Sequence, residues 1–153
     1  MIPNRTKVEL LRGSINLGSD TVRIALLKAS TEYDADPDIH AFVDDVLDGG
    51  TTGEELSDTN YSRQTLSGTT VNQDDADDEA EWQADDVRFD DLGGSETVEA
   101  VLLYKQVGGD DSTPADDAII RIIDDDDVTD LEADTDGKDF EIIWSDDAIL
   151  GAQ

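Results

Sequence analysis

Short apolar runs separated by acidic and glycine-rich or serine-rich stretches are the main pattern of this chain. The runs VRIALL, VEAVLLY, AIIRII and FEIIW are rich in branched residues and have the length of single strands. Each is bounded by turn-forming residues such as Gly, Asp, Ser and Pro. The pattern predicts strands in residues 21–29, 79–82, 86–89, 96–107, 116–123 and 138–144.

Other segments show helical spacing or a turn. Residues 4–12 carry apolar side chains one helical turn apart and end at Gly13, which predicts a short first helix. Residues 37–50 open on a proline, carry apolar residues at helical spacing and close on two glycines, which predicts a second short helix. Residues 61–73 alternate in polarity around a central Ser–Gly pair, which predicts a β-hairpin.

The order of these elements defines the expected fold class. No strand–helix–strand alternation appears, so an antiparallel sheet is favoured over a parallel one. We expect a mainly β fold, an antiparallel β-sandwich or barrel with one or two short helices near the N-terminal side. A chain of 153 residues has the size of one domain with its own core, so we expect residues 1–153 to form a single domain.

Acidic side chains dominate the composition. The chain holds 40 Asp and Glu against 10 Lys and Arg, which gives a formal net charge of -30. Exposed carboxylates repel one another over a Debye length of about 30 Å at 0.01 M salt but only about 3 Å at 1 M, so such a chain should gain stability in salt. High net charge with few aromatic residues is also typical of disorder, but the apolar runs can build a core. We therefore expect a folded, salt-adapted protein.

The composition argues against several classes of site and partner. The chain has no cysteine, so it can form no disulfide, thiolate nucleophile or thiolate-bound metal site. No apolar stretch has the length of a membrane helix, and the first ten residues lack the apolar run of a secretory signal, so we expect no membrane association. We expect no direct contact with nucleic acid, because phosphates are bound by Lys and Arg and this surface would repel them.

One acidic stretch partly matches a calcium loop. In EADTDGKDFEII, Glu132, Asp134 and Asp136 fit the opening of an EF-hand loop. The closing position requires a bidentate glutamate but holds Ile143, and FEIIW has the pattern of a strand where the motif requires a helix. Residues 124–127 form a second acidic run. We interpret both as solvated turns, and we predict no metal site and no cofactor.

The sequence contains no recognisable catalytic motif. His40 is the single histidine, so a Ser–His–Asp relay would depend on it, and we expect it at the surface or in a cap. A hydrolase built on paired carboxylates would need two acids with raised pKa in an apolar cleft, and forty acidic residues form pairs by chance. We therefore predict no catalytic residues and no enzymatic activity.

The tryptophans and several arginines have structural interpretations. Trp82 and Trp144 end apolar runs, so we expect them in the core or at its rim rather than as carbohydrate platforms. Arg63, Arg88 and Arg121 lie within strand candidates, where we expect pairing with acidic neighbours.

A series of short stretches forms a further pattern over nearly the whole chain. In order they read LLRGSINLGSDTVRIALLKAS, YDADPDIHAFVDDV, YSRQTLSG, ADDVRFDDL, AVLLYKQVGGDDSTP, AIIRIID and FEIIWSDDAILGAQ. The series resembles a family of small virion structural proteins of tailed double-stranded DNA viruses. The residues that match the family's characteristic stretches are His40, Phe42, Asp44, Asp45 and Val46, residues 61–66, and Trp144, Asp146 and Ala148.

The resemblance implies a non-enzymatic component of the virus particle. It points to the outer surface of the head, as a capsid decoration or turret protein made in the host cytoplasm, with the major capsid protein or other virion proteins as partners. The stretches DDADDEAEWQ and IIDDDDVTD are more acidic than the family pattern, which fits a virus of a halophilic, archaeal host. Because a capsid lattice offers rotational symmetry, we also expect a symmetric homo-oligomer.

Two alternatives to the head position stay open at this stage. One is a tail or neck structural protein. The other is a host- or carbohydrate-binding module on the virion, for which Trp82, Tyr61 or Trp144 would have to be exposed.

The N-terminal region is the least acidic part of the chain. It holds half of the positive charge, at Arg5, Lys7, Arg12, Arg23 and Lys28. We predict that this region faces the capsid or a neighbouring subunit, while DDADDEAE and DDDD face the salt solution or lie at turn tips.

Overall fold

Antiparallel β-sheet is the main regular structure of the protein, a computed structural model that describes residues 1–28, 34–47, 53–75, 78–124, 131, 133–144 and 149–152. A central sheet has β1 beside β8, β9 beyond β8, and the two short strands β2 and β3 sharing the other side of β1. The bounds are β1 (Val22–Lys28), β2 (Glu54–Glu55), β3 (Gln64–Thr65), β8 (Ala100–Lys105) and β9 (Ile119–Ile123). This is the mainly β, antiparallel fold class that the sequence predicts.

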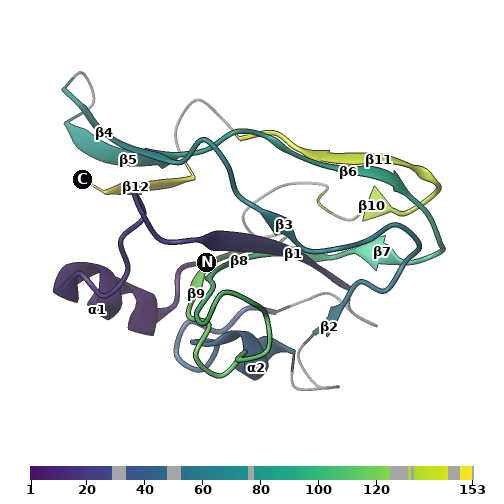
Figure 1. Cartoon of the computed structure of the whole chain (residues 1–153), viewed down its shortest axis with the longest axis horizontal. Coiled ribbons are helices and arrows are strands. Elements are labelled where there is room, and N and C mark those ends of the chain that lie inside the picture. The colour runs from purple at the N-terminus through teal and green to yellow at the C-terminus, as the bar shows by residue number, and fades with distance from the viewer. Residues whose placement is uncertain are drawn as a thin grey trace.

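A second layer of strands covers one face of the central sheet (Figure 1). It contains a sheet in the order β12–β5–β4 and the pair β11–β6, while the short pair β10–β7 lies at one end. The bounds are β4 (Thr70–Asp74), β5 (Glu79–Gln83), β6 (Val87–Leu92), β7 (Thr97–Val98), β10 (Ala133–Asp134), β11 (Lys138–Ile142) and β12 (Leu150–Ala152). No sheet among the described strands closes on itself, so the arrangement is sandwich-like and not a barrel.

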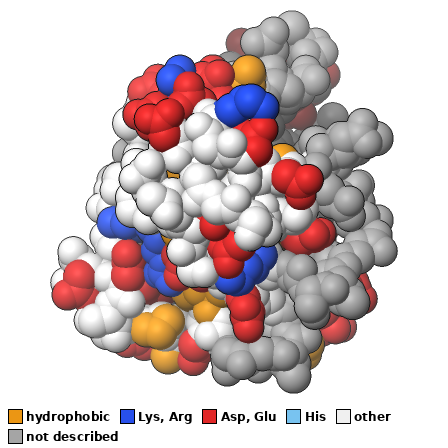
Figure 2. Space-filling view, turned by 90° about the vertical axis from the view of Figure 1, so that its right-hand side faces the viewer, with side chains coloured by type: hydrophobic (Ala, Val, Ile, Leu, Met, Phe, Trp, Pro, Cys, Tyr) orange, Lys and Arg blue, Asp and Glu red, His pale blue; other side chains and the backbone are white. Residues whose placement is uncertain are grey.

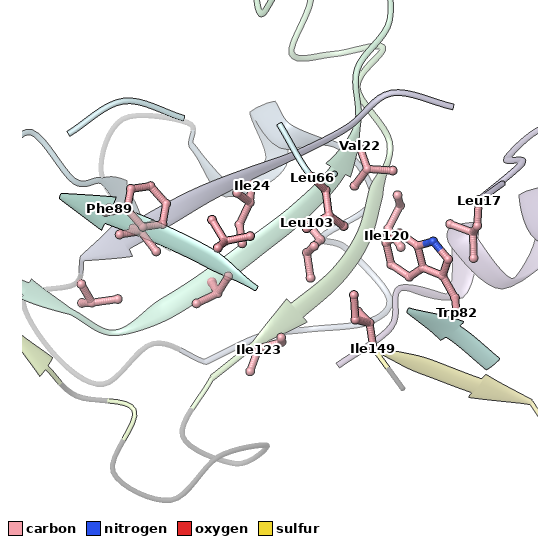
Figure 3. Close-up of a cluster of buried hydrophobic side chains, with 14 of the residues drawn as sticks. Leu17, Val22, Ile24, Leu66, Trp82, Phe89, Leu103, Ile120, Ile123 and Ile149 are labelled. Carbon is pink, nitrogen blue, oxygen red and sulfur yellow. The ribbon is translucent and has the colours of Figure 1, made fainter. Parts of the chain in front are cut away.

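The main hydrophobic core lies between the two layers. Alternate residues of β1 and β8, such as Ile24 and Leu103, point into it and are fully buried. Trp82 of β5 reaches the same core and packs near Ile120 and Ile149, as Figure 3 shows. Burying each large side chain of this kind contributes about 1.5–3 kcal/mol. The core position expected for Trp82 is confirmed.

The opposite face of the central sheet has a smaller core of its own. Ala25, Leu27 and Tyr104 point to this side and are fully buried. They are covered by the short helix α2 (Val43–Val46) and by the start of the chain. Because both faces are covered, β1 and β8 read as continuous apolar runs and show no alternation of apolar and polar residues.

The N-terminal helix α1 (Asn4–Arg12) confirms the first predicted helix. It ends at Gly13, whose φ of 74° lets its N–H reach the carbonyls of Glu9 and Leu10. The Thr6 hydroxyl donates to the Ile119 carbonyl, and the Met1 carbonyl accepts from the Ile122 N–H at 2.9 Å. The start of the chain therefore covers the outer edge of β9. Neither helix in the described ranges has the length and apolarity that crossing a bilayer requires.

The second helix is much shorter than the sequence predicts. Only Val43–Val46 are helical, and residues 37–40 form a turn that leaves Ile39 59% exposed. The Ala41 carbonyl accepts from Ile119 on β9 at 3.0 Å instead of continuing a helix. Long-range pairing thus overrides the local helical spacing. The Gly–Gly pair expected to end this helix lies outside the described residues.

The hairpin predicted in residues 61–73 is wrong. β3 pairs with β1, whereas β4 pairs with β5 in the other layer, so the chain changes sheets between them. The change occurs at Gly68, where φ is 64°, and the Ser67 carbonyl accepts from the Asp85 N–H at 2.9 Å. The predicted strands at residues 21–29, 79–82, 86–89, 116–123 and 138–144 are confirmed within a few residues, and residues 96–107 split into β7 and β8.

Candidate functional site

Two of the acids considered as calcium ligands, Asp134 and Asp136, are engaged in other contacts. Asp134 accepts from the Thr97 hydroxyl at 2.8 Å, and Asp136 pairs with Lys138, which lowers the pKa of the Asp136 carboxyl. The segment after Gly137 is the strand β11, as the sequence predicts. Within the described ranges no group of three or more His, Asp or Glu side chains could hold a metal ion. Glu132 and residues 125–127 lie outside those ranges.

His40 and the aromatic candidates are not exposed. His40 is 1% exposed, and its Nδ1 accepts from the Asp36 N–H at 3.0 Å, so it caps a turn from a buried position and not from the surface. Trp82 is 1% exposed. Trp144 is half-buried at the rim of the core, where its indole N–H donates to the Asp85 carbonyl at 3.0 Å. Tyr61 is half-buried and stacks on Phe89 with ring centroids 6.0 Å apart.

Arg88 and Arg63 form the ion pairs predicted with acidic neighbours. Arg88 is exposed and pairs with Asp90 at 2.7 Å and with Asp139. Arg63 pairs with Glu55. Arg121 donates to the backbone carbonyl of Ile149, which ties β9 to the segment before β12.

Arg63 is the centre of a larger polar network at the edge of the central sheet. Its Nε and Nη2 donate to the two carboxylate oxygens of Glu55, each at 2.7 Å. The Tyr61 hydroxyl donates to the same carboxylate at 2.9 Å and accepts from the Leu26 N–H of β1 at 3.1 Å. Tyr61 thereby fills the gap that β2 and β3 leave along β1, because the chain departs from the sheet edge between them.

The other half of the network reaches the loop between β8 and β9. Arg63 Nη1 donates to the Tyr104 hydroxyl at 2.9 Å, and that hydroxyl donates to Asp111 at 2.7 Å. Asp111 also accepts from Gln106 at 2.7 Å and pairs with Arg23 at 3.3 Å. We refer to Arg23, Glu55, Tyr61, Arg63, Tyr104, Gln106 and Asp111 as the polar network. Its partners come from β1, β2, β8 and two loops, so it joins segments that are distant in sequence.

Burial and charge set the protonation of these groups. Burial and the neighbouring Glu55 raise the pKa of Tyr61, and burial and the Asp111 hydrogen bond raise that of Tyr104, so both phenols stay neutral. Burial opposes ionisation of Asp111, but hydrogen bonds from Tyr104 and Gln106, aided by the arginines, outweigh it and lower its pKa. The carboxylate is therefore charged and fully engaged. Both phenol hydroxyls and the three nitrogens of Arg63 donate to acceptors within the network, whereas Arg23 Nε has no hydrogen-bond partner among the described residues. The network is therefore a structural tie whose best-satisfied part is centred on Arg63.

Asp117 lies beside this network with an incomplete set of partners. It is fully buried, and its Oδ1 accepts from the Val107 N–H at 2.7 Å, while its Oδ2 has no hydrogen-bond partner among the described residues. Burial, together with the nearby Asp111 charge, raises the pKa of the Asp117 carboxyl. A protonated Asp117 would remove the cost of an unpaired buried charge.

The outward side of α1 is unlike the rest of the surface. Thr6 is buried and Leu10 packs against the core, whereas five basic or large apolar side chains of this helix are exposed. These five define the α1 face: Arg5, Lys7, Val8, Leu11 and Arg12. Leu11 is 90% exposed and Val8 is 40% exposed. Residues 1–19 hold three basic residues and one acidic residue, whereas the whole chain has a net charge of -30.

The predicted N-terminal basic region is smaller than the sequence indicates. Arg23 belongs to the polar network, and Lys28 pairs with Glu96 and donates to the Ser57 hydroxyl at 3.0 Å. These two side chains are thus engaged within the sheet, so the exposed part of the predicted region is the basic side chains of α1, which lie beside the exposed Val8 and Leu11. On another face of the molecule, shown in Figure 2, acidic side chains are widely spread and the Lys and Arg side chains lie among them.

Comparison with known proteins found no counterpart for this chain. No protein-family model, no curated protein and no solved structure matched it. The site must therefore be interpreted from its own residues.

Sequence reasoning missed most of the polar network. Arg63 and an acidic partner were expected, but Tyr104 reads as one more apolar strand residue, and Asp111 is one acid among forty. The one signal that the sequence offered for this network is the pair Tyr61 and Arg63, two residues apart and next to the short strand β3.

Proposed function

We propose that this protein is a structural component of a tailed virus particle, adapted to high salt, which binds the outer surface of the head through the α1 face. The single observation that carries the proposal beyond the sequence resemblance is the α1 face itself. It is an exposed basic and apolar patch on a protein whose net charge is -30.

The chemistry of the α1 face suits a protein partner. Leu11 at 90% exposure and Val8 at 40% exposure offer apolar area to bury. Arg5 and Arg12 lie within 2.8 Å and 3.8 Å of Glu9, yet their side chains remain 51% and 66% exposed, so each can form further ion pairs. In a salt-adapted particle the capsid proteins would also be acidic, and a basic patch is then the part of this chain that they attract.

The remaining surface suits the outside of a particle in salt. Acidic side chains remain hydrated when the salt concentration is high, and this hydration keeps the outer surface soluble. The polar network and the two cores hold the sandwich together without disulfides, which this cysteine-free chain cannot form. These features support a passive covering role, with no chemistry required of the bound protein.

Charge reversal on α1 tests the proposal. Particles would be assembled with the Arg5→Glu, Lys7→Glu, Arg12→Glu variant and separated from free protein by density-gradient centrifugation. We expect the variant to remain in the free fraction. The matched control is Arg88→Glu with Lys138→Glu, which reverses exposed basic residues on β6 and β11 and should still be incorporated.

Two outcomes would count against this function. Incorporation of the α1 variant at the normal level would show that α1 is not the attachment surface. Incorporation into tails or necks in place of heads would support the alternative position on the particle.

A further inference from the structure

Strand β4 forms an open edge of the second layer (Figure 1). It pairs with β5 along its whole length, and no strand in the described ranges pairs with its other side. The Trp82 carbonyl on β5 points away from β4, toward β12, where it accepts from the Ile149 N–H at 2.9 Å. Val71 lies directly opposite Trp82. In an antiparallel ladder the N–H and C=O of Val71 must then point outward, away from β5.

The open edge lies in the longest uncharged part of the sequence. Residues 64–73 contain no Asp, Glu, Lys or Arg, although 33% of the chain is charged. Proteins usually protect an exposed edge strand with charged side chains, proline or a bulge. Residues 69–73 have no charge and no proline, and the β4–β5 register runs without a shift. Val71 is 56% exposed at the middle of this edge.

We propose that β4 pairs with β4 of a second copy of this chain, antiparallel and across a two-fold axis at Val71. In this register Val71 faces the partner's Val71, and Thr69 faces the partner's Gln73. These are the residues whose N–H and C=O point outward, so they supply the backbone hydrogen bonds between the two copies. The two three-stranded sheets then continue into one.

The charge of the chain favours a second copy of this protein as the partner that pairs with β4. Two chains that each carry -30 repel one another wherever like-charged surfaces meet, and a two-fold axis brings the same surface from each copy together, so an uncharged surface is favoured at the axis. Charge also selects the register, because a shift toward Asp74 would bring carboxylates of the two copies closer, where like charges opposite each other are unfavourable. A strongly charged foreign partner would gain nothing from this strand. The inference does not rest on the proposed function, since α1 belongs to a separate element.

A cysteine at position 71 tests the pairing directly. The chain has no cysteine, so Val71→Cys introduces a single thiol. Antiparallel partners of this kind have Cα atoms about 5.5 Å apart, within the range that a disulfide spans. We expect mild oxidation in concentrated KCl to give a covalent dimer. Ile143→Cys, at another exposed apolar position that is 70% exposed, is the matched control and should stay monomeric.

Sedimentation of the full chain in the same salt provides a second measurement. The unaltered protein should sediment as a dimer at sufficient concentration. Val71→Pro removes an outward N–H, and Val71→Glu places two carboxylates face to face, so both should lose the dimer, while Ile143→Glu should keep it. Circular dichroism would verify that each variant is folded. A monomeric unaltered protein, a dimer that survives both Val71 variants, or equal cross-linking at positions 71 and 143 would overturn the proposal.

Discussion

Removal of the Arg63 guanidinium should destabilise the fold far more than the same change at the surface. Arg63 is 15% exposed and Glu55 is 27% exposed, and the guanidinium holds both oxygens of that carboxylate at 2.7 Å. Arg63→Met keeps much of the apolar stem but leaves Glu55 partly buried with Tyr61 as its remaining partner in the network. It also removes the bond to Tyr104.

The loss of stability in Arg63→Met depends on the Glu55 carboxylate, which loses its ion-pair partner. Breaking a fully buried ion pair by removing one partner costs about 3–5 kcal/mol, and the partial exposure of this pair reduces that to about 2–4 kcal/mol. A domain of this kind has a total stability of about 5–15 kcal/mol, so the loss is a large fraction. Glu55→Leu combined with Arg63→Met should cost about 1–3 kcal/mol less than the sum of the single changes, because the double variant buries no unpaired charge.

Urea unfolding at constant high salt would measure these differences. Trp82 is 1% exposed in the folded protein, so its fluorescence should report loss of the core. Arg88→Met is the control, since Arg88 has a 55% exposed side chain and solvent-exposed ion pairs contribute little to stability. Equal midpoints for Arg63→Met and Arg88→Met would refute the claim that the polar network holds the sheet edge.

Three further predictions concern salt, pH and the chain crossing between sheets. The thermal midpoint of unfolding should rise between about 0.01 M and 1 M KCl, because salt screens the repulsion between carboxylates. An increase of about 3 kcal/mol in the free energy of unfolding would raise the midpoint by roughly 6–12 °C. A midpoint that does not change with salt would contradict a salt-adapted fold. Asp117→Asn should stabilise the fold more near pH 7 than below about pH 4. The pKa of Asp117 is raised in the folded protein above the unfolded value of 3.8, so ionisation of this carboxyl at higher pH costs stability, and asparagine avoids that cost. A difference in urea midpoint between the two proteins that does not change with pH would contradict this prediction. Gly68→Ala should destabilise by slightly more than the about 1–2 kcal/mol expected for Gly109→Ala. Both positions have positive φ, but a Cβ at Gly68 would lie 2.4 Å from the exposed Asp85 carboxyl, which must then move and weaken its hydrogen bond from the Ser67 hydroxyl. Equal thermal midpoints for the two variants would rule out this extra cost.

The sequence correctly predicted the helices and strands whose formation depends on residues close together in the chain. Gly13 ends α1 because its left-handed conformation satisfies the last carbonyls, and the sequence shows both the glycine and the spacing before it. The strands β1, β8 and β9 are mostly apolar on both faces because both faces of the central sheet are covered, and this pattern is visible in the sequence.

Long-range pairing decided the elements that the sequence did not predict. The turn at Gly68 resembles a hairpin, but Ser67 bonds to Asp85, and the strands on its two sides belong to different sheets. Likewise the first part of the helix expected to begin at Pro37 is a turn, and only Val43–Val46 are helical.

The members of the polar network could not be paired from the sequence, because they are also brought together by long-range contacts. Arg63 and Tyr104 are separated by 41 residues, and Asp111 is distinguished from the other acids only by what lies against it. The α1 face was seen in part, because the basic residues are evident in the sequence, but the engagement of Arg23 and Lys28 in the sheet is not.

The most direct test of the central claim is a cryo-EM reconstruction of the native virus particle in high salt. The account predicts density for this chain on the outer surface of the head, with α1 against the capsid shell and the acidic surface outward. Density confined to the neck or tail, or density on the head with α1 facing the solution, would contradict it.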